Sequence, residues 1–214
     1  MTRPAISKPQ RRTQEQRSSE MRVRLLDATI DCLVEYGYAG TTTPRVAERA
    51  GVTRGAQVHH FGSKTDLVVA AISHLAQRRT EAAMRELDRF RREGDPLAAV
   101  LDFLWELHQG PLFIAAMELW VAGRVDRLLA AEMAKVEPFV NNAVLMSVAQ
   151  LVPDEVDRKV ARDFLYTAMD ALRGILMSDF IDPDSDRARR RWARAAAHLR
   201  LAAESVLPTL RAER

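Results

Sequence analysis

Residues 41–68 read TTTPRVAERAGVTRGAQVHHFGSKTDLV and predict two short helices joined at a glycine. Thr42 or Thr43, before Pro44, can cap the first helix, because its side-chain oxygen accepts a hydrogen bond from a backbone N–H that lacks a partner within the helix. Gly51 gives the backbone the freedom for a sharp turn. Thr53 then caps the second helix, which we expect over residues 54–60. A compact pair of this kind can place its second helix in the major groove of a DNA duplex.

A longer helix is predicted on each side of this pair. Upstream, Met21, Leu25, Ala28 and Cys32 recur at helical spacing, and glycines at 37 and 40 end the pattern. Cys32 is the single cysteine, which favours a small buried apolar residue in a reducing compartment. Downstream, a long helix begins at Ser63 with a sequence close to a capping box.

The remainder of the chain also predicts helices alone. Glycine and proline pairs mark boundaries, and no segment alternates apolar and polar residues as a strand does. We therefore expect an all-α protein. After the long helix that begins at Ser63, further helices are expected near residues 96–109, 111–122, 125–151, 154–180 and 184–206.

Positive charge is concentrated near the start of the sequence. The chain carries a net charge of +3, but residues 1–64 hold 11 Lys and Arg against 6 Asp and Glu. A basic head favours a polyanionic partner. Residues 1–19 contain few apolar residues and no helical periodicity, so we expect a basic flexible arm. This arm either follows a minor groove of DNA or is a tail without a role. No signal peptide or membrane span is apparent, so we expect a cytoplasmic protein without a membrane partner.

The stretch from residue 20 to residue 80 resembles the DNA-binding signature of the TetR family. The resemblance rests on Ala47, the Ala50-Gly51-Val52-Thr53 turn, Gly55, His60-Phe61, Ser63-Lys64 and Leu67 at their combined spacing. It implies a three-helix helix-turn-helix domain over residues 20–80, joined through a long fourth helix to a helical domain over residues 81–214. It implies that this second domain dimerises and binds a small-molecule effector.

The resemblance also implies which residues meet double-stranded DNA. The expected DNA-binding residues are Thr42, Arg45, Thr53, Arg54, Gln57, Val58, His59 and Lys64. Gln57 has paired donor and acceptor groups suited to adenine, and Val58 can touch a thymine methyl group. Lys64 is expected to bind a phosphate. Gln57 and Val58 depart from the usual family pattern, which has an apolar residue and a tyrosine there.

Large adaptable side chains within residues 96–180 suit a pocket for an apolar ligand. The candidate pocket residues are Trp105, His108, Met117, Trp120, Asn142 and Tyr166, although each could equally belong to an ordinary core. Small residues beside large ones in the helices near 154–180 and 184–206 predict a homodimer interface, or burial within one subunit. The basic run 187–194 is interpreted as a solvated helix face.

Together these features predict a repressor that a small apolar or amphipathic effector releases from a pseudo-palindromic operator. Two alternatives stay open: a regulator that activates or needs a co-repressor, and a helical binding module that has lost DNA binding. The sequence holds no H-E-x-x-H, G-x-S-x-G or G-x-G-x-x-G motif, so we expect no enzyme, no metal site and no cofactor.

Overall fold

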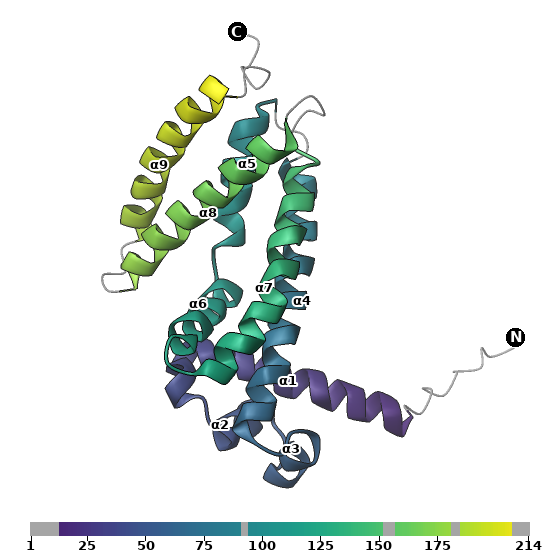
Figure 1. Cartoon of the computed structure of the whole chain (residues 1–214). Helices are drawn as coiled ribbons and strands as arrows, with labels where there is room; N and C mark the ends of the chain where they lie inside the picture. The colour runs from purple at the N-terminus through teal and green to yellow at the C-terminus, as the bar shows by residue number, and fades with distance from the viewer. Residues whose placement is uncertain (1–12, 91–93, 152–156, 181–184, 207–214) are drawn as a thin grey trace, which may run out of the picture. The chain divides into compact units, whose positions relative to one another are not determined.

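The computed structural model describes residues 13–90, 94–151, 157–180 and 185–206, and within these residues all regular structure is helical (Figure 1). The helices are α1 (Gln14–Gly40), α2 (Thr43–Arg49), α3 (Arg54–His60), α4 (Lys64–Phe90), α5 (Pro96–Leu107), α6 (Pro111–Gly123), α7 (Arg127–Val148), α8 (Arg158–Asp179) and α9 (Ser185–Val206). The all-α prediction is confirmed. None of the described helices is long and apolar enough to cross a membrane.

The chain divides into two units, which we call unit 1 and unit 2, and the division falls between Ala71 and Ile72. The boundary expected at residue 80 lies further along the same helix, because α4 starts in unit 1 and continues into unit 2 without a break. The helix itself contains no sequence signal at the division, since its apolar spacing runs on through both parts.

The first helix begins earlier than expected. Thr13 accepts a hydrogen bond from the backbone N–H of Gln16, and the Gln16 side chain accepts one from the backbone N–H of Thr13. This capping box starts α1 at Gln14, so the predicted flexible arm is wrong for residues 14–19, and residues 1–12 lie outside the described residues. Gly37, with φ of 65° and ψ of 178°, interrupts the helix near its end.

The core of unit 1 forms where α1 meets the helix pair α2 and α3 and the start of α4. Cys32 is fully buried there, as expected. The buried residues of this core are Leu25, Leu26, Ala28, Cys32, Val46, Ala50, Phe61, Leu67 and Ala71. Ser63 and Asp66 form the reciprocal hydrogen bonds of a capping box at the start of α4, with the shorter aspartate in the place of the usual Glu or Gln.

The turn between α2 and α3 needs a glycine at position 51. Gly51 has φ of 62°, in the left-handed region that side chains with a Cβ rarely adopt. The Arg24 side chain donates a hydrogen bond to the carbonyl of Ala50, and a Cβ at Gly51 would lie 3.3 Å from the same guanidinium. The turn is therefore constrained both by its backbone conformation and by α1.

Unit 2 packs the second part of α4 with α5 to α9. Helix α8 packs against α5 and α9, and α6 packs against α7. Phe103, Leu104, Leu165, Ala168 and Met169 are fully buried in its core. The packing of these helices positions the cavity described below.

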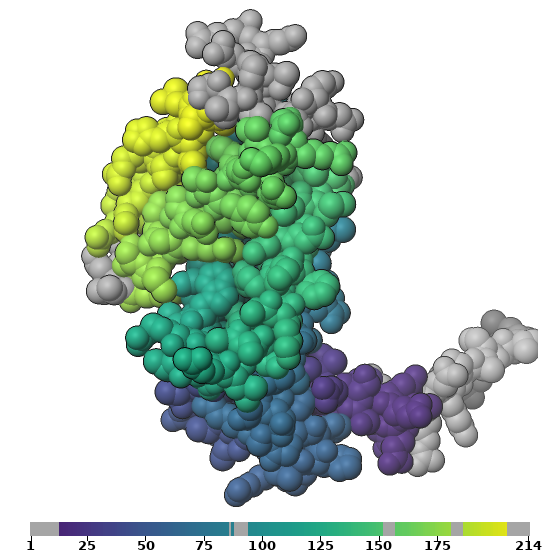
Figure 2. Space-filling view, viewed as in Figure 1, coloured from purple at the N-terminus to yellow at the C-terminus, as the bar shows by residue number. Residues whose placement is uncertain are grey.

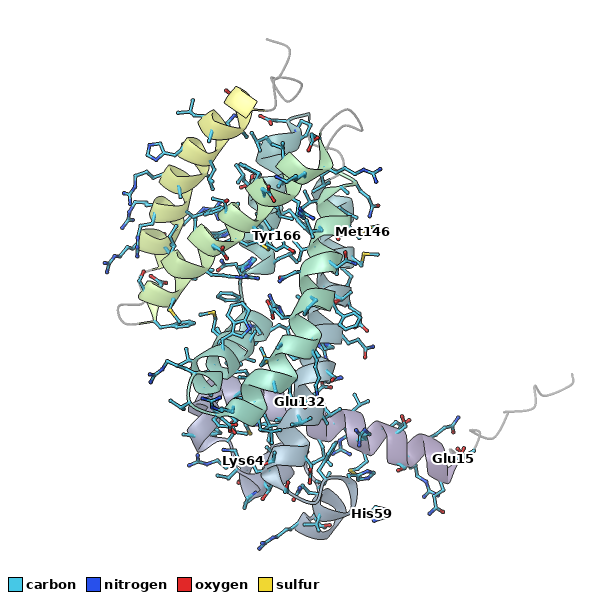
Figure 3. The ribbon with its side chains drawn as sticks, viewed as in Figure 1. Glu15, His59, Lys64, Glu132, Met146 and Tyr166 are labelled. Carbon is cyan, nitrogen blue, oxygen red and sulfur yellow. The ribbon has the colours of Figure 1, made fainter. Side chains whose placement is uncertain are left out.

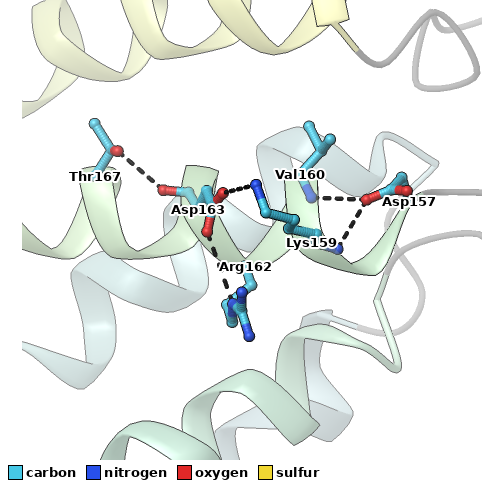
Figure 4. A network of polar contacts seen from close by, with 6 residues as sticks. All are labelled: Asp157, Lys159, Val160, Arg162, Asp163 and Thr167. Carbon is cyan, nitrogen blue, oxygen red and sulfur yellow. Dashed lines mark hydrogen bonds and ion pairs between the residues drawn. The ribbon is translucent and has the colours of Figure 1, made fainter.

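The start of α8 is fixed by a polar network on the surface (Figure 4). Asp157 caps the helix by accepting hydrogen bonds of 2.9 Å from the backbone N–H groups of Lys159 and Val160. Along the same helix, Asp163 pairs with Lys159 and lies close to Arg162. Exposed pairs of this kind contribute at most about 0.5 kcal/mol each, so the cap is the main local determinant.

The two glycines of the helix pair provide a matched test of the turn. Replacing Gly51 by alanine should lower the free energy of unfolding by about 1–2 kcal/mol, because a Cβ in the left-handed region is strained. Gly55→Ala in α3 should leave it unchanged or raise it by up to about 1 kcal/mol, because a Cβ there finds open space and ordinary contacts. Urea unfolding followed by circular dichroism measures both. Equal effects of the two changes would contradict this account of the turn.

Candidate nucleic-acid interface and ligand cavity

Helix α3 exposes one side and buries the other. A helix turns by about 100° per residue, so Arg54, Gly55, Val58 and His59 share one arc of its surface. All four are exposed, with Val58 at 51%. We call these four residues the α3 arc. Figure 3 shows His59 on α3, in the same unit as Lys64 at the start of α4.

Gln57 lies on the opposite side of α3, where the sequence prediction placed a base-reading residue. Its side chain is only 1% exposed, and its amide nitrogen donates a 2.7 Å hydrogen bond to the carbonyl of Phe61. In this structure the amide cannot meet a base edge, so the predicted adenine contact is wrong. The physical reason is that the backbone of α3 ends at Phe61 and the glutamine side chain satisfies that end from within the core.

The threonine caps predicted from the sequence are present. Thr42 accepts a hydrogen bond from the backbone N–H of Arg45, and Thr53 accepts one of 3.2 Å from that of Ala56. Each cap fixes the start of a short helix. Of the two threonines considered for α2, it is Thr42 that caps.

Two cations of unit 1 are oriented by contacts with aromatic rings and carbonyl groups. The Arg45 guanidinium lies 4.5 Å from the centre of the Tyr36 ring and donates to the Gly40 carbonyl at 2.6 Å. The Lys64 ammonium lies 4.4 Å from the Tyr38 ring centre and donates to the Tyr38 carbonyl at 2.8 Å. Both side chains therefore have preferred positions rather than moving freely.

Unit 2 contains a cavity of about 440 Å³ between α6, α7 and α8. The spacing of its lining residues shows that each helix contributes one face. On α8 the residues occur at i, i+3, i+4 and i+7, and on α7 at i and i+4. The lining residues are Met117, Trp120, Glu137, Asn141, Asp170, Arg173, Gly174 and Met177.

The structure brings two of the six predicted pocket residues, Met117 and Trp120, to the cavity wall. Trp105 and Tyr166 instead pack with the core of unit 2. Figure 3 shows Tyr166 on α8. Asn142 is exposed, and its neighbour Asn141 lines the cavity in its place, because adjacent residues on a helix point about 100° apart. A pocket role for Asn142 is therefore not supported.

The sixth residue, His108, is buried near the end of α5. It is 2% exposed, and its Nδ1 lies 2.8 Å from the carbonyl of Leu104. A carbonyl oxygen accepts only, so Nδ1 carries the proton and Nε2 has a bare lone pair. Burial, reinforced by the charges of Arg79 and Arg173, lowers the pKa of His108 to about 3.

The cavity is open to solvent on one side and has several charged residues in its wall. The Arg173 guanidinium donates to Asn141 Oδ1 at 3.2 Å and lies 3.6 Å from Glu137 and 3.7 Å from Asp170. Burial lowers the pKa of Arg173, and the neighbouring carboxylates act against that shift. Burial likewise lowers the pKa of Arg79 to about 10.

Sequence reasoning missed the polar side of this cavity. It searched for large apolar residues and so passed over Glu137, Asn141, Asp170 and Arg173, as well as Arg79 on α4. A signal was available: Asp170, Arg173, Gly174 and Met177 share one helical face, on which a charged pair interrupts apolar residues. What the spacing could not show is that three such faces meet.

Sequence comparison finds similarity to known regulators. The sequence model of the family described as bacterial regulatory proteins, tetR family, matches residues 25–71. The chain is 31% identical over 185 residues to the HTH-type transcriptional regulator CymR of Pseudomonas putida. The aligned region covers 85% of this chain and 90% of CymR. It is 27% identical over 192 residues to the HTH-type transcriptional regulator TtgR of Pseudomonas putida, and this alignment covers 80% of this chain and 88% of TtgR.

Comparison with solved structures concerns the fold. A structure from Mesorhizobium loti, described as a TetR-family transcriptional regulator, covers 89% of this chain and 98% of its own, with a TM-score of 0.67 and 15% identity. The arrangement of helices therefore recurs in proteins of quite different sequence.

The buried histidine predicts a specific pH dependence of stability. Between pH 6.5 and about 3, His108 binds a proton in the unfolded chain but not in the folded one, so the free energy of unfolding falls as the pH is lowered. From pH 7 to pH 5 this residue should contribute a loss of about 1–2 kcal/mol. Urea unfolding of His108→Gln at the two pH values should show a correspondingly smaller difference than the parent. His198→Gln, at an exposed position on α9, is the control, and an unchanged difference in His108→Gln would contradict the assignment.

Proposed function

The chain belongs to the TetR family of bacterial regulatory proteins, and on this premise we propose that it represses transcription as a homodimer that a small molecule releases from a pseudo-palindromic operator. Family membership makes it a helix-turn-helix transcriptional regulator and not an enzyme. The observation that carries the proposal is the exposed α3 arc on a helix whose other side is locked into the core of unit 1. Acting on bacterial operators places the protein in the cytoplasm.

In this proposal α3 enters the major groove. Arg54 can donate to the acceptor pair of guanine, Val58 can contact a thymine methyl group, and His59 can hydrogen-bond a base edge or a phosphate. Gly55 lies between them on the α3 arc, and a Cβ there would meet only Thr53 within 4 Å. The missing side chain lets the backbone of α3 come close to the duplex.

Contacts to the phosphate backbone come from the edges of the same surface. Arg45 and Lys64 supply positive charge, and Thr42 and Thr53 supply hydroxyl groups at the starts of α2 and α3. These contacts set the position of α3 in the groove but carry no sequence information themselves. Because each neutralised phosphate releases counterions, they make binding dependent on salt.

The proposed dimer forms through α8 and α9, which lie along an outer face of unit 2 (Figures 1 and 2). Both helices expose small residues, which are Thr167 and Gly174 on α8 and Ala193 and Ala197 on α9, and Gly174 also borders the cavity. A Cβ at Gly174 would meet nothing within 4 Å. Two copies of this surface can approach closely around a two-fold axis, and that symmetry calls for an inverted repeat in the operator.

Release by a ligand would act through α4. This one helix begins with Lys64 in unit 1 and carries Arg79 beside the charged cavity of unit 2. A ligand that favours a different position of α4 would change the separation of the two DNA-binding units in the dimer. A coupling of about 1–3 kcal/mol would weaken operator binding by roughly 5–150-fold.

Selection of bound sequences from random duplex DNA tests the operator. With the purified protein at physiological salt, we expect an inverted repeat whose half-sites are centred about one helical turn or slightly more apart. Such spacing places two copies of α3 in successive major grooves on one side of the duplex. Enrichment of a single half-site without symmetry would contradict the dimer, and no enrichment would contradict sequence-specific binding.

Two substitutions separate base contacts from phosphate contacts on the selected duplex. Arg54→Ala should cost about 1–3 kcal/mol of binding free energy and relax the preference at one base pair in each half-site. Arg45→Gln should weaken binding to all duplexes and flatten the slope of log affinity against log salt by about 1 for each protomer. Arg127→Gln, at an exposed position at the start of α7 in unit 2, is the control, because it belongs neither to the proposed DNA contacts nor to the proposed dimer surface. Titrations at several salt concentrations measure these effects, and an unchanged slope for Arg45→Gln would remove Arg45 from the phosphate contacts.

A further inference from the structure

Three buried polar atoms near the cavity of unit 2 have no hydrogen-bond partner among the described residues. They are Nε2 of His108, Oε1 of Glu137 and Nε of Arg173. Leaving a buried donor or acceptor unpaired costs about 1–3 kcal/mol, so native proteins rarely keep three together. They mark a buried polar cluster next to the cavity, and Arg173 is the member of it that also lines the cavity wall.

The charges around the cluster are not balanced in the interior. Arg173 and Arg79 lie over Trp120, with guanidinium carbons 4.8 Å and 6.0 Å from the ring centre. Among the described residues Arg79 forms no ion pair, and Glu137 is the carboxylate that raises its pKa against the effect of burial. Asp170 beside Arg173 has a side chain that is 75% exposed, so water screens its charge. Two guanidinium groups thus face one largely buried carboxylate.

His108 does not restore the balance, because it is neutral. Its Nδ1–H donates to the Leu104 carbonyl, and its bare Nε2 can only accept a hydrogen bond. The Arg173 Nε–H can only donate. A ligand that complements this cluster must therefore bring negative charge for the guanidinium groups.

The rest of the cavity wall is apolar and aromatic. Met117 and Trp120 on α6 and Met177 on α8 flank the charged residues. A volume of about 440 Å³ suits a small organic molecule rather than an inorganic ion alone. Methionine side chains adapt to ligands of varied shape, and the Trp120 ring offers a flat surface.

We propose that the cavity binds an organic carboxylate, whose anionic group pairs with the 16% exposed side chain of Arg173 in the field of Arg79 and whose apolar body lies against Trp120, Met117 and Met177. This inference rests on the proposed function, because it gives the chemical class of the effector. A charge-assisted pair with an arginine is among the strongest hydrogen bonds available to a ligand.

The test is calorimetric titration of the full chain with carboxylic acids and their matched primary amides. The probes are benzoate, naphthalene-2-carboxylate, 4-phenylbutanoate, octanoate and dodecanoate. We expect at least one acid to bind at least about tenfold more tightly than its amide, which is the factor for one charge-assisted hydrogen bond. Binding of the amides as tightly as the acids, or of none of the acids, overturns the proposal.

Variants assign that preference to the cluster. Arg173→Gln should abolish most of the preference for the acid over its amide. Arg173→Lys should retain part of this preference, and Arg79→Gln should reduce it. Arg162→Gln on α8 and Arg85→Gln on α4 change exposed arginines on the same helices and should leave it unchanged. Circular dichroism confirms that each variant folds. If Arg173→Gln does not fold, the acid and amide comparison on the parent chain and on Arg79→Gln decides the matter.

A separate measurement distinguishes this inference from the proposed function. Affinity for the selected duplex is measured with and without the acid that binds. If the acid binds with the predicted preference but leaves DNA affinity unchanged, the release mechanism fails and the carboxylate site stands. If only a neutral or cationic compound binds and releases the DNA, the proposed function stands and the carboxylate site is wrong.

Discussion

The buried hydrogen bond from the Gln57 side-chain amide to the Phe61 carbonyl fixes the rotation of α3 about its own axis. Gln57 points inward and Phe61 lies in the core of unit 1. In a helix of seven residues, these two positions determine which of the other residues face solvent. Arg54, Val58 and His59 are therefore held outward by packing rather than by their own contacts. A helix this short has little stability of its own, so the recognition surface depends on this lock, on the Thr53 cap and on the Gly51 turn.

Unit 2 differs from unit 1 in the hydrogen bonding of its buried polar groups. Among the described residues, the buried polar side chains of unit 1 have hydrogen-bond partners, whereas in unit 2 one atom each of Arg173, Glu137 and His108 has none. Such a site lowers the stability of the empty protein and gains most when a complementary ligand binds. Helix α4 has Arg79 next to this cluster and Lys64 in unit 1, so a ligand that binds beside the cluster would act on the same helix that carries the proposed phosphate-binding cation. That continuity is what a ligand-controlled repressor requires.

The sequence predicted the fold class, a cap at Thr42 or Thr43, the cap at Thr53 and the turn at Gly51, because these follow from local rules of spacing, capping and backbone freedom. The outward positions of Arg54, Val58 and His59 were implied by the family resemblance, and Gly55 was not among the expected contact residues. It did not predict that Gln57 is buried, since a polar residue is normally placed outside unless its partner is known, and the partner is a backbone carbonyl. It missed the capping box at Thr13 because the surrounding polar residues suggested an arm. The charged wall of the cavity depends on three helices meeting, which helical spacing within one segment cannot reveal.

The central claim is that the α3 arc is the surface that meets DNA, and a thiol-labelling scan tests it most directly. Single cysteines are introduced at positions 54, 55, 57, 58 and 59, and labelling rates are compared with and without the selected duplex; the native Cys32 is fully buried and serves as the slow reference. The account predicts fast labelling at 54, 55, 58 and 59, strong protection of these four by DNA, and slow labelling at 57 in both states. Fast labelling at 57, or no protection at 58 and 59 by a duplex that binds, would contradict it.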